Sequence, residues 1–375
     1  MTEPIRILHV FGKTNLGGAE SRTMDLYRHI NRDKVQFDFL VHTDENCFFD
    51  HEIQELGGRI YRVPRFKLYN IFSYRKAIKT FFKKHHEFKA VQGHMTSTAS
   101  IYLPIAKKAG IPITIAHARS AGVDQGIKGS VTRLLRWNLW KKADYLFTCS
   151  EIAAISVYGE KAANELAIFI PNAIDAEKFA FNEEIRRNLR NELSIEDKFV
   201  IGHVGRFHYA KNHEYMIDVF QSLSETRING QEPVLLLVGE GDGMQDIKDQ
   251  VKKLNLQEKV LFLGNHADIW NYYQVFDYFV FPSRFEGLPG TVVEAQASGL
   301  RTVMSDTLTK EAVFSDLVHA LPITAKPHVW ADYIIQTSLY NRENTCQLVK
   351  DSGFDVNAQA QKMIEFYETG NKEVL

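Results

Sequence analysis

Short apolar runs, separated by stretches with helical periodicity, recur along the whole chain and restrict its fold more than any other feature. Most runs have four to six residues bounded by glycine or polar residues, which is typical of strands buried on both faces of a parallel sheet. Parallel strands need long crossover connections, and the helical stretches supply them. The predicted strands are 7–11, 37–41, 113–117 and 145–150 in the first half, and 199–204, 234–238, 260–263, 278–281 and 302–304 in the second.

At 375 residues the chain is too long for one ordinary hydrophobic core, which predicts two domains. Because strands and helices alternate in both halves, the expected fold class is α/β, with two doubly wound, Rossmann-like domains facing each other across a cleft. The domain boundary is expected near Pro171 to Phe179. Ligands of such sheets bind beyond the carboxyl ends of the strands, so loops of both domains should line the cleft.

The composition is that of a globular protein, with 45% apolar and 24% charged residues. Three cysteines, Cys47, Cys149 and Cys346, are far apart and odd in number, which favours reduced thiols in the cytoplasm over a disulfide framework. Residues 1–4 lack the features of a signal peptide, and no apolar run approaches the roughly 20 residues of a membrane-spanning helix. We therefore expect a cytoplasmic protein.

Charge is unevenly distributed along the chain. Residues 1–170 contain 25 Lys and Arg against 16 Asp and Glu, whereas the remainder contains 20 against 30. Basic residues interleaved with aromatic ones lie between Arg62 and Lys89 and again between Arg133 and Lys142. One interpretation is docking on an anionic membrane surface, at the inner face of the cell membrane. The other is two ordinary amphipathic helices with aromatic side chains in the core; no nucleic-acid partner is expected, because no base-reading fold is visible.

Two carboxylates separated by seven residues, Glu286 and Glu294, are the strongest functional signal. Glu286 lies in a loop just after a predicted strand, and Glu294 is expected about two turns into the following helix, which Gly299 ends. Gly287 and Gly290 leave backbone N–H groups open at the N-terminus of that helix, where the helix dipole favours an anion. Two acceptors for sugar hydroxyls beside a phosphate site suit a sugar nucleotide.

The Glu-x7-Glu element resembles that of the retaining glycosyltransferase family 4, which has the GT-B fold. Further motifs resemble family markers in the same order, and together they cover about residues 6–330. They are the glycine loop 15–20, the interdomain segment 170–175 with Ala173 where Gly is usual, the phosphate-binding element 202–207 with Lys211 and Asn212, and the nucleotide-side turn 237–241. Within the family, the chain resembles the bacterial exopolysaccharide and capsule enzymes.

The resemblance implies a domain plan and an activity. Residues 1–172 would bind the acceptor, residues 173–355 would bind the nucleotide-sugar donor, and a C-terminal helix of about 356–375 would pack back on the first domain. The implied enzyme is a retaining hexosyltransferase. It would move a hexose or N-acetylhexosamine from a nucleotide sugar, with UDP favoured by family frequency, to a lipid-linked saccharide or oligosaccharide in exopolysaccharide or capsule biosynthesis.

The resemblance also implies roles for individual residues. Arg206 and Lys211 would neutralise the diphosphate and stabilise the leaving nucleotide. Glu286 would bind hydroxyls of the donor sugar, and Glu294 hydroxyls of the ribose. The backbone amides expected to contact sugar and phosphate are those of Gly287, Leu288, Gly290 and Thr291, and Gly17 and Gly18 would let the opposite domain approach the diphosphate. Outside the motif, an Arg and a Lys at this spacing are more often ordinary surface residues.

His117 ends a predicted strand where the family often has a histidine close to the donor sugar, commonly followed by an acid. Here Ala118 and Arg119 follow, so His117 is either a catalytic residue in the cleft or a structural histidine. His94 ends another predicted strand and is a candidate for the acceptor side. No metal-binding spacing is visible, and we expect a metal-independent reaction without a cofactor, since Arg206 and Lys211 can replace a divalent cation at the diphosphate.

Two other functions are compatible with these patterns. A nucleotide-sugar epimerase shares the GT-B architecture but lacks the Glu-x7-Glu element. A non-catalytic glycosyltransferase-like partner subunit has no need of intact Arg206, Lys211, Glu286 and Glu294. The sequence 239–243 contains three glycines, but their spacing does not fit a dinucleotide fingerprint. The base, the sugar, the acceptor and the linkage are not readable from the sequence.

Overall fold

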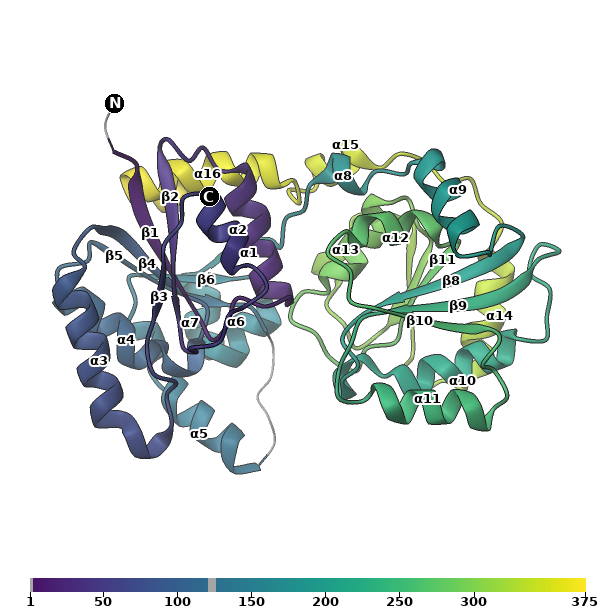
Figure 1. Cartoon of the computed structure of the whole chain (residues 1–375), viewed down its shortest axis with the longest axis horizontal. Helices are drawn as coiled ribbons and strands as arrows, with labels where there is room; N and C mark the ends of the chain where they lie inside the picture. The colour runs from purple at the N-terminus through teal and green to yellow at the C-terminus, as the bar shows by residue number, and fades with distance from the viewer. Residues whose placement is uncertain (1–2, 121–125) are drawn as a thin grey trace. The chain divides into compact units, whose positions relative to one another are not determined.

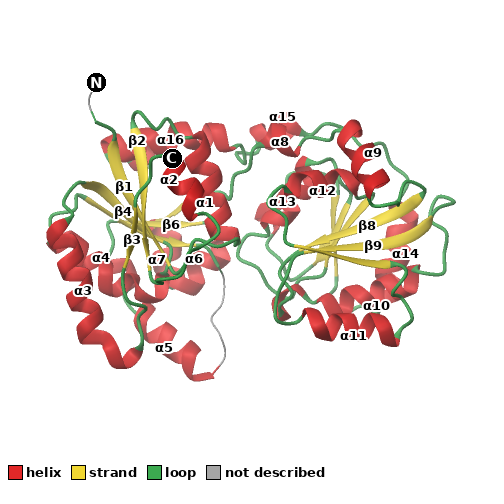
Figure 2. Ribbon diagram, viewed as in Figure 1, coloured by secondary structure: helices red, strands yellow, loops and turns green. Residues whose placement is uncertain are grey.

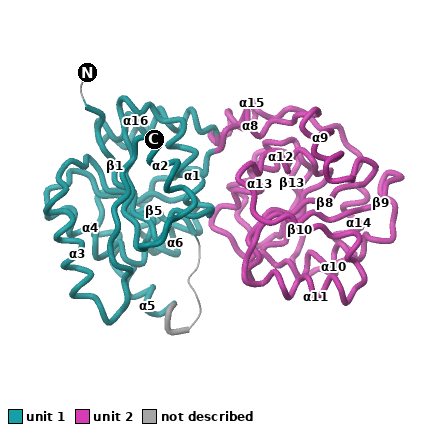
Figure 3. Tube along the Cα trace, viewed as in Figure 1, with its two compact units in different colours: residues 1–173, 355–375 teal, residues 174–354 magenta. Residues whose placement is uncertain are grey.

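The computed structural model describes residues 3–120 and 126–375 and divides into two compact units (Figure 3). Unit 1 comprises Met1–Ala173 and Asp355–Leu375, and unit 2 comprises Ile174–Phe354. Both units are α/β, and Figure 2 shows helices on both faces of each sheet.

Unit 1 is built on a seven-stranded parallel sheet with the strand order β3-β2-β1-β4-β5-β6-β7 (Figure 1). The strands are β1 (Ile5–Phe11), β2 (Val35–Val41), β3 (Ile60–Arg62), β4 (Phe88–Gly93), β5 (Ile113–Ala118), β6 (Tyr145–Thr148) and β7 (Ala167–Phe169). The helices are α1 (Gly18–His29), α2 (Asp50–Glu55), α3 (Ile71–Lys84), α4 (Thr96–Lys108), α5 (Gly126–Arg136), α6 (Glu151–Tyr158), α7 (Glu160–Leu166) and α16 (Val356–Thr369).

Unit 2 has a six-stranded parallel sheet with the order β10-β9-β8-β11-β12-β13. The strands are β8 (Lys198–Val204), β9 (Glu232–Val238), β10 (Val260–Gly264), β11 (Tyr278–Phe281), β12 (Thr302–Ser305) and β13 (Val318–Leu321). The helices are α8 (Ala176–Phe179), α9 (Glu183–Glu192), α10 (His213–Leu223), α11 (Met244–Lys253), α12 (Ile269–Val275), α13 (Gly290–Ala297), α14 (Pro327–Thr337) and α15 (Cys346–Asp351).

All nine strands predicted from the apolar runs are present, and the prediction of two doubly wound α/β domains is confirmed. Three strands were not predicted: β3, β7 and β13. They have only three or four residues and are partly exposed, so they lack the continuous apolar run of a buried strand. β4 was expected only from the segment before His94, because Lys89 and Gln92 interrupt its apolar pattern.

In each sheet the first strand lies near the middle. Successive strands are added first toward one edge of the sheet and then, after a single switch, toward the other edge. The neighbours β1 and β4 mark this switch point in unit 1, and β8 and β11 mark it in unit 2. Loops leave the carboxyl ends of these two strands toward opposite sides of the sheet, which opens a crevice. The sequence motifs with glycines, cations and carboxylates follow β1, β8 and β11, so the fold brings them to these two edges.

The last helix, α16, packs in unit 1 beside α1, as Figure 1 shows. Its buried residues Met363, Ile364 and Phe366 belong to the core that β1, β2 and β5 line. Polar contacts hold both ends of the helix: the Gln359 amide donates to the Pro171 carbonyl at 2.7 Å, and the Tyr145 hydroxyl donates to the Gly370 carbonyl at 2.5 Å. Unit 1 is therefore completed by the last residues of the chain.

Replacing Phe366 by Ala should destabilise unit 1 by about 3–5 kcal/mol, because this fully buried ring packs on Tyr145 and Phe147 and leaves a cavity. Hydrogen exchange of the strand amides in unit 1 measures the loss. Phe72→Ala is the matched control, since that ring is 86% exposed and its removal should change stability by less than about 0.5 kcal/mol. Equal protection in the two variants would contradict the role of α16.

Candidate functional site

The candidate site of unit 2 lies at the switch point between β8 and β11. These strands pair in parallel, with Tyr278 opposite Ile201, so their carboxyl ends meet at the same edge. After β8 the chain forms a loop that carries Arg206 and a short 3-10 helix that ends at Lys211. After β11 a second loop carries Glu286 and leads into α13. Residues from two distant sequence motifs thereby reach one place.

Lys211 and Glu286 form an ion pair at this edge. The Lys211 ammonium nitrogen lies 2.7 Å from Glu286 Oε1, and the two side chains are 19% and 15% exposed. The same nitrogen lies 4.8 Å from the centre of the Phe281 ring, which faces it as a cation–π partner. Arg206 is exposed to solvent on the neighbouring loop. The two residues predicted to meet the diphosphate and the donor sugar are thus in direct contact.

Glu294 is nearly buried, with 6% of its surface exposed. It is the fifth residue of α13, which begins at Gly290, so it lies about one turn into the helix. The expectation of two turns was wrong, because residues 286–289 form a loop and do not belong to the helix. The Tyr273 hydroxyl donates a hydrogen bond of 2.7 Å to Glu294 Oε2. Tyr273 was not predicted, since no motif or spacing connects it to the carboxylate.

The N-terminus of α13 lies between the two carboxylates. Its N-cap residue, Pro289, makes no side-chain capping hydrogen bond, and a side chain built on Gly290 would meet no atom within 4 Å. The Thr291 hydroxyl is buried and has no hydrogen-bond partner among the described residues. Gly287 and Leu288, in the loop before the helix, are buried. An open helix N-terminus with a spare hydroxyl suits an anionic group.

The glycines that follow β9 support the loop after β8. A Cβ atom on Gly239 would lie 2.2 Å from the Gly205 carbonyl oxygen, and one on Gly241 would lie 2.4 Å from the Phe207 carbonyl oxygen. Both glycines also have positive φ angles, of 140° and 157°. The Phe207 amide donates to the Glu240 carbonyl at 3.0 Å. These glycines let two backbones pack directly, which fixes the loop that carries Arg206.

Two buried histidines lie beneath Lys211. His203 in β8 donates through Nδ1 to the Val280 carbonyl at 2.8 Å, and its ring contacts His213 in α10 with a centroid distance of 4.7 Å. Burial, together with a smaller contribution from the Lys211 charge, lowers the pKa of His203 to about 4. Burial and the same charge also hold the pKa of His213 far below its ordinary value. Both imidazoles are neutral at pH 7 and add no charge to the site.

At the switch point of unit 1, Gly17 is the N-cap of α1 and Gly18 is its first residue. A side chain on Gly18 would meet no atom within 4 Å, so the backbone there is open. A Cβ atom on Gly17 would lie 2.5 Å from Glu20 Oε2, which places the Glu20 carboxylate against this glycine loop. The loop thus has both an open helix N-terminus and a carboxylate next to it.

His117 is fully buried in unit 1. Its Nδ1 lies 2.8 Å from the Gln92 amide nitrogen, and Gln92 accepts a hydrogen bond of 2.6 Å from the Tyr367 hydroxyl of α16. Its Nε2 has no partner among the described residues, and burial holds its pKa well below the ordinary value. Its ring has no exposed surface within the described residues, and the catalytic role of His117 stays a prediction.

His94 belongs to the same buried cluster. Its Nε2 lies 3.0 Å from Nδ1 of His9, and its ring centre lies 5.3 Å from that of His117. Arg119, which follows β5, is partly buried, and desolvation of its guanidinium lowers its pKa to about 10. It donates to the Asn172 side-chain oxygen at 2.8 Å. The predicted interdomain motif around Asn172 is therefore attached to unit 1 by a residue that the sequence pattern did not single out.

The two basic and aromatic stretches lie on α3, α5 and their flanking segments, and α4 packs against both helices (Figure 1). Their aromatic residues divide between two environments. Tyr74, Phe81 and Phe82 enter the core, as an ordinary amphipathic helix requires. The five most exposed large apolar side chains of the described part of unit 1 also lie here: Leu68 at 57%, Tyr69 at 82%, Phe72 at 86%, Leu134 at 71% and Trp137 at 70%. We call these five side chains the apolar face.

The segments that carry the apolar face also carry exposed basic side chains, namely Arg65, Lys67, Arg75, Lys76, Lys79, Lys83 and Arg133.

No described helix is both long and apolar enough to cross a bilayer. Among the described residues, no group of three or more His, Cys, Asp or Glu side chains is arranged to hold a metal ion.

Comparison with known families matches both units. Residues 185–371 match the family described as Glycosyl transferases group 1, and residues 16–178 match Glycosyltransferase Family 4. The putative glycosyltransferase EpsF of Bacillus subtilis is 32% identical over 98% of this chain and 97% of its own length. The capsular polysaccharide biosynthesis glycosyltransferase CapH of Staphylococcus aureus is 24% identical over 97% of this chain and 98% of its own length.

A third relative is the Escherichia coli UDP-Gal:alpha-D-GlcNAc-diphosphoundecaprenol alpha-1,3-galactosyltransferase, 28% identical over 60% of this chain and 59% of its own length. Among solved structures, Anabaena HepE in complex with UDP-glucose has a TM-score of 0.78 and 18% identity, covering 97% of this chain and 100% of that one. This likeness supports the GT-B fold for the chain.

The two buried imidazoles of unit 2 predict a pH dependence of stability. Between pH 6.5 and 4 the unfolded state binds a proton at His203 that the folded state does not, because the folded pKa is about 4. The contribution of His203 to the free energy of unfolding is therefore fully present above pH 6.5. As the pH drops below 6.5, this contribution falls by up to about 1.4 kcal/mol per pH unit. Urea unfolding at pH 7, 6 and 5 measures the slope.

His203→Asn keeps an amide donor for the Val280 carbonyl and should flatten this slope. His328→Gln is the matched control, because His328 is exposed and its loss should leave the slope unchanged. An unchanged slope in His203→Asn would contradict the titration assigned to the buried imidazole.

Proposed function

We propose, from the premise that this chain belongs to the glycosyltransferases of group 1 and family 4, that it is a retaining hexosyltransferase of polysaccharide biosynthesis. It takes a hexose or N-acetylhexosamine from a UDP-sugar and transfers it to a lipid-linked saccharide. The observation that carries the proposal is the meeting of Lys211 and Glu286 at the switch point, in the loop that leads into α13, which carries the buried Glu294.

The donor is bound in unit 2 by complementary groups. The diphosphate lies between Arg206, Lys211 and the N-terminus of α13, where the amides of Gly290 and Thr291 face it. Glu286, with the amides of Gly287 and Leu288, binds hydroxyls of the sugar. Glu294 binds the ribose hydroxyls.

The ion pair between Lys211 and Glu286 links the phosphate contact to the sugar contact. An ammonium group has three N–H donors, and Glu286 accepts from it at 2.7 Å, which leaves donors for phosphate oxygens. The pair holds the phosphate contact and the sugar contact in a fixed relation before the donor arrives, so little reorganisation accompanies binding. The two cations take the place of a divalent metal at the diphosphate, and the reaction is proposed to be metal-independent.

The chemical step is a displacement on one face of the sugar. The bond between the anomeric carbon and the phosphate oxygen breaks, and a bond from that carbon to the acceptor hydroxyl forms. The acceptor proton passes to the leaving phosphate, whose growing negative charge is stabilised by Arg206, Lys211 and the helix N-terminus. His117 is assigned no contact with the reacting atoms, because it is fully buried.

The substrate classes rest on similarity and on surface chemistry. HepE was solved with UDP-glucose, and the name of the E. coli relative includes both a UDP-sugar and a diphosphoundecaprenol acceptor. CapH is named for capsular polysaccharide biosynthesis. A lipid-linked acceptor is held at a membrane, and the apolar face of unit 1 has exposed basic residues around it. We propose that this face docks on an anionic bilayer at the inner side of the cell membrane.

Nucleotide binding provides the first test. UDP should raise the melting temperature of the protein, and at 100 times its dissociation constant it adds about 2.7 kcal/mol of stability. GDP, ADP and NAD should give smaller shifts. Glu294→Ala should remove most of the UDP shift, because a buried carboxylate that binds ribose is lost. Glu258→Ala, an exposed carboxylate of the same unit, is the matched control and should keep it. Thermal unfolding with each nucleotide is the measurement.

Three outcomes contradict the proposal in different ways. If no nucleotide shifts the transition, the chain is a partner subunit and not an enzyme of this type. A shift with NAD alone excludes a nucleotide-sugar site. If incubation with a UDP-sugar and no acceptor yields a new UDP-sugar, the protein is an epimerase.

Membrane docking predicts that vesicles with anionic lipid retain the protein and that neutral vesicles do not. Replacing Phe72 and Trp137 together by Ala should weaken binding by at least about tenfold, because these exposed rings would bury apolar area in the interface. Co-sedimentation with phosphatidylcholine vesicles, with and without phosphatidylglycerol, measures it. Leu339→Ala removes an 83% exposed side chain of unit 2 and is expected to have no effect. Equal retention by both vesicle types would exclude the charge-dependent docking.

A further inference from the structure

The Glu294 carboxylate is nearly buried, so neighbouring groups in the protein determine its orientation. Only 6% of the residue is exposed, and a buried charge is costly unless hydrogen-bond donors hold it. The Tyr273 hydroxyl supplies one such donor at 2.7 Å from Oε2. The same hydroxyl lies 3.3 Å from the Thr291 carbonyl, in the first turn of the same helix. Tyr273 therefore contacts α13 both at its first turn and at the carboxylate.

The Tyr273 ring is closely packed in the core of unit 2. It is fully buried and lies against three aromatic rings, with centroid distances of 5.7 Å to Phe179, 5.8 Å to Phe276 and 5.6 Å to Phe279. A tyrosine side chain has two rotatable bonds before its hydroxyl, and close packing fixes both. The direction from which the hydroxyl approaches Glu294 is set by the core of unit 2.

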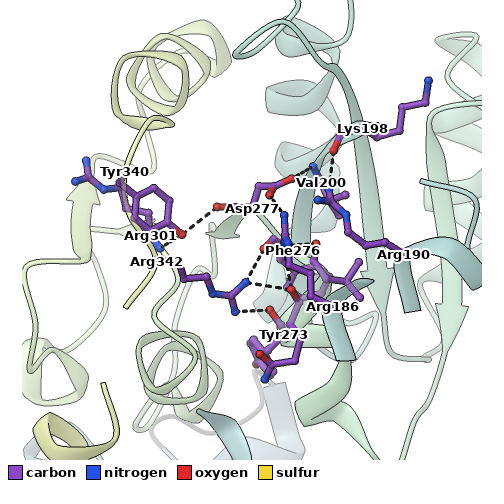
Figure 4. A network of polar contacts seen from close by, with 12 residues as sticks. Arg186, Arg190, Lys198, Val200, Tyr273, Phe276, Asp277, Arg301, Tyr340 and Arg342 are labelled. Atoms are coloured by element: carbon purple, nitrogen blue, oxygen red, sulfur yellow. Dashed lines mark hydrogen bonds and ion pairs between the residues drawn. The ribbon is translucent and has the colours of Figure 1, made fainter. Parts of the chain in front are cut away.

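The backbone of Tyr273 is held by a partly buried cation, Arg342 (Figure 4). Its guanidinium donates to the Tyr273 carbonyl at 2.8 Å and to the Phe276 carbonyl at 3.0 Å. Its Nε donates to the Ser298 carbonyl at 2.6 Å. These carbonyls lie at the C-terminal ends of α12 and α13, where the helix dipoles favour a cation. One side chain thus joins the helix that carries Tyr273 to the helix that carries Glu294.

A second arginine strengthens the same end of α12. Arg186 of α9 donates to the Val275 and Phe276 carbonyls, each at 3.0 Å, and forms an ion pair with Asp277 (Figure 4). Arg190 contacts the other oxygen of Asp277 at 2.8 Å. With this network, the carbonyl groups where α12 ends and β11 begins are bound by fixed donors. The end of α12 becomes a rigid support for Tyr273.

We infer that Tyr273 is a positioning residue for donor binding: its hydroxyl orients the Glu294 carboxylate toward the ribose, and Arg342 holds the two helices in register for that contact. The inference rests on the proposed function, in which Glu294 binds the ribose hydroxyls. A carboxylate accepts about four hydrogen bonds through two oxygens, so the bond from Tyr273 leaves acceptor capacity for a ribose diol. Without the hydroxyl the carboxylate would lose a donor and its fixed orientation.

The test compares two ligands and four proteins by isothermal titration calorimetry. The ligands are UDP and 2′,3′-dideoxyuridine diphosphate, which lacks both ribose hydroxyls. The proteins are wild type, Tyr273→Phe, Glu294→Ala and Tyr278→Phe. Tyr278 is the matched control, because it is a buried tyrosine of the same unit whose hydroxyl lies 2.9 Å from Thr337 Oγ1, away from the carboxylates.

Wild type should bind UDP about tenfold more tightly than the dideoxy ligand, since a hydrogen bond to a charged group is worth about this factor or more. Tyr273→Phe should bind UDP about fivefold more weakly than wild type and bind the dideoxy ligand equally well. Glu294→Ala should no longer distinguish the two ligands. Tyr278→Phe should match wild type with both.

The failure of the inference can be separated from failure of the proposed function. If wild type distinguishes the ligands and Tyr273→Phe distinguishes them equally well, the positioning role is wrong and the ribose contact stands. If Tyr273→Phe weakens both ligands by the same factor, the tyrosine supports the fold and not the ribose contact. If wild type does not distinguish the ligands, the ribose role of Glu294 is wrong and the inference falls with it.

Discussion

The pairing of β8 with β11 is the constraint on which the candidate site depends. These parallel strands are neighbours in the sheet but far apart in sequence, and their loops leave in opposite directions. Lys211 follows one strand and Glu286 the other, so an ion pair of 2.7 Å forms between residues 75 positions apart. A shift in the pairing of these strands would separate the two motifs, although each motif would keep its own local structure.

Polar side chains with little exposure to solvent occur in both units. Glu294 is buried in unit 2 and His117 in unit 1, and the partly buried Arg342 and Arg119 lie in the same two units. A buried polar group is tolerated when fixed partners satisfy it, and those partners then determine its orientation. Arg342 is an example. Desolvation lowers its pKa to about 9, and carbonyl groups at the ends of two helices accept hydrogen bonds from its guanidinium. The rigidity of the site follows from this pattern, because few alternative arrangements satisfy the same groups.

Much of the fold and part of the site could be predicted from the sequence, for physical reasons. Buried strands of a parallel sheet show continuous apolar runs, and Glu286 and Glu294 stand at a recognisable spacing beside helix-starting glycines. Tyr273 and Arg342 could not be predicted, because their partners are 21 residues away for the hydroxyl and 69 for the guanidinium. His117 ends a predicted strand, but its link to α16 runs through Gln92 and Tyr367, and the return of α16 to unit 1 follows from the family resemblance and not from a local pattern.

Charge acts on two scales in this chain. The residues of unit 1 include 27 Lys and Arg against 20 Asp and Glu, and those of unit 2 include 18 against 26. An anionic nucleotide in unit 2 would therefore bind against the net charge of that unit. Exposed charges beyond about 8 Å are screened at physiological salt, so in the proposed donor site the local cations Arg206 and Lys211 and the α13 dipole would outweigh this net charge. On unit 1 exposed basic residues lie on the same segments as the apolar face, so net positive charge and local charge have the same sign there. The proposed membrane contact of unit 1 would therefore gain from the net charge of its unit, whereas the proposed donor site of unit 2 would depend on local charges alone.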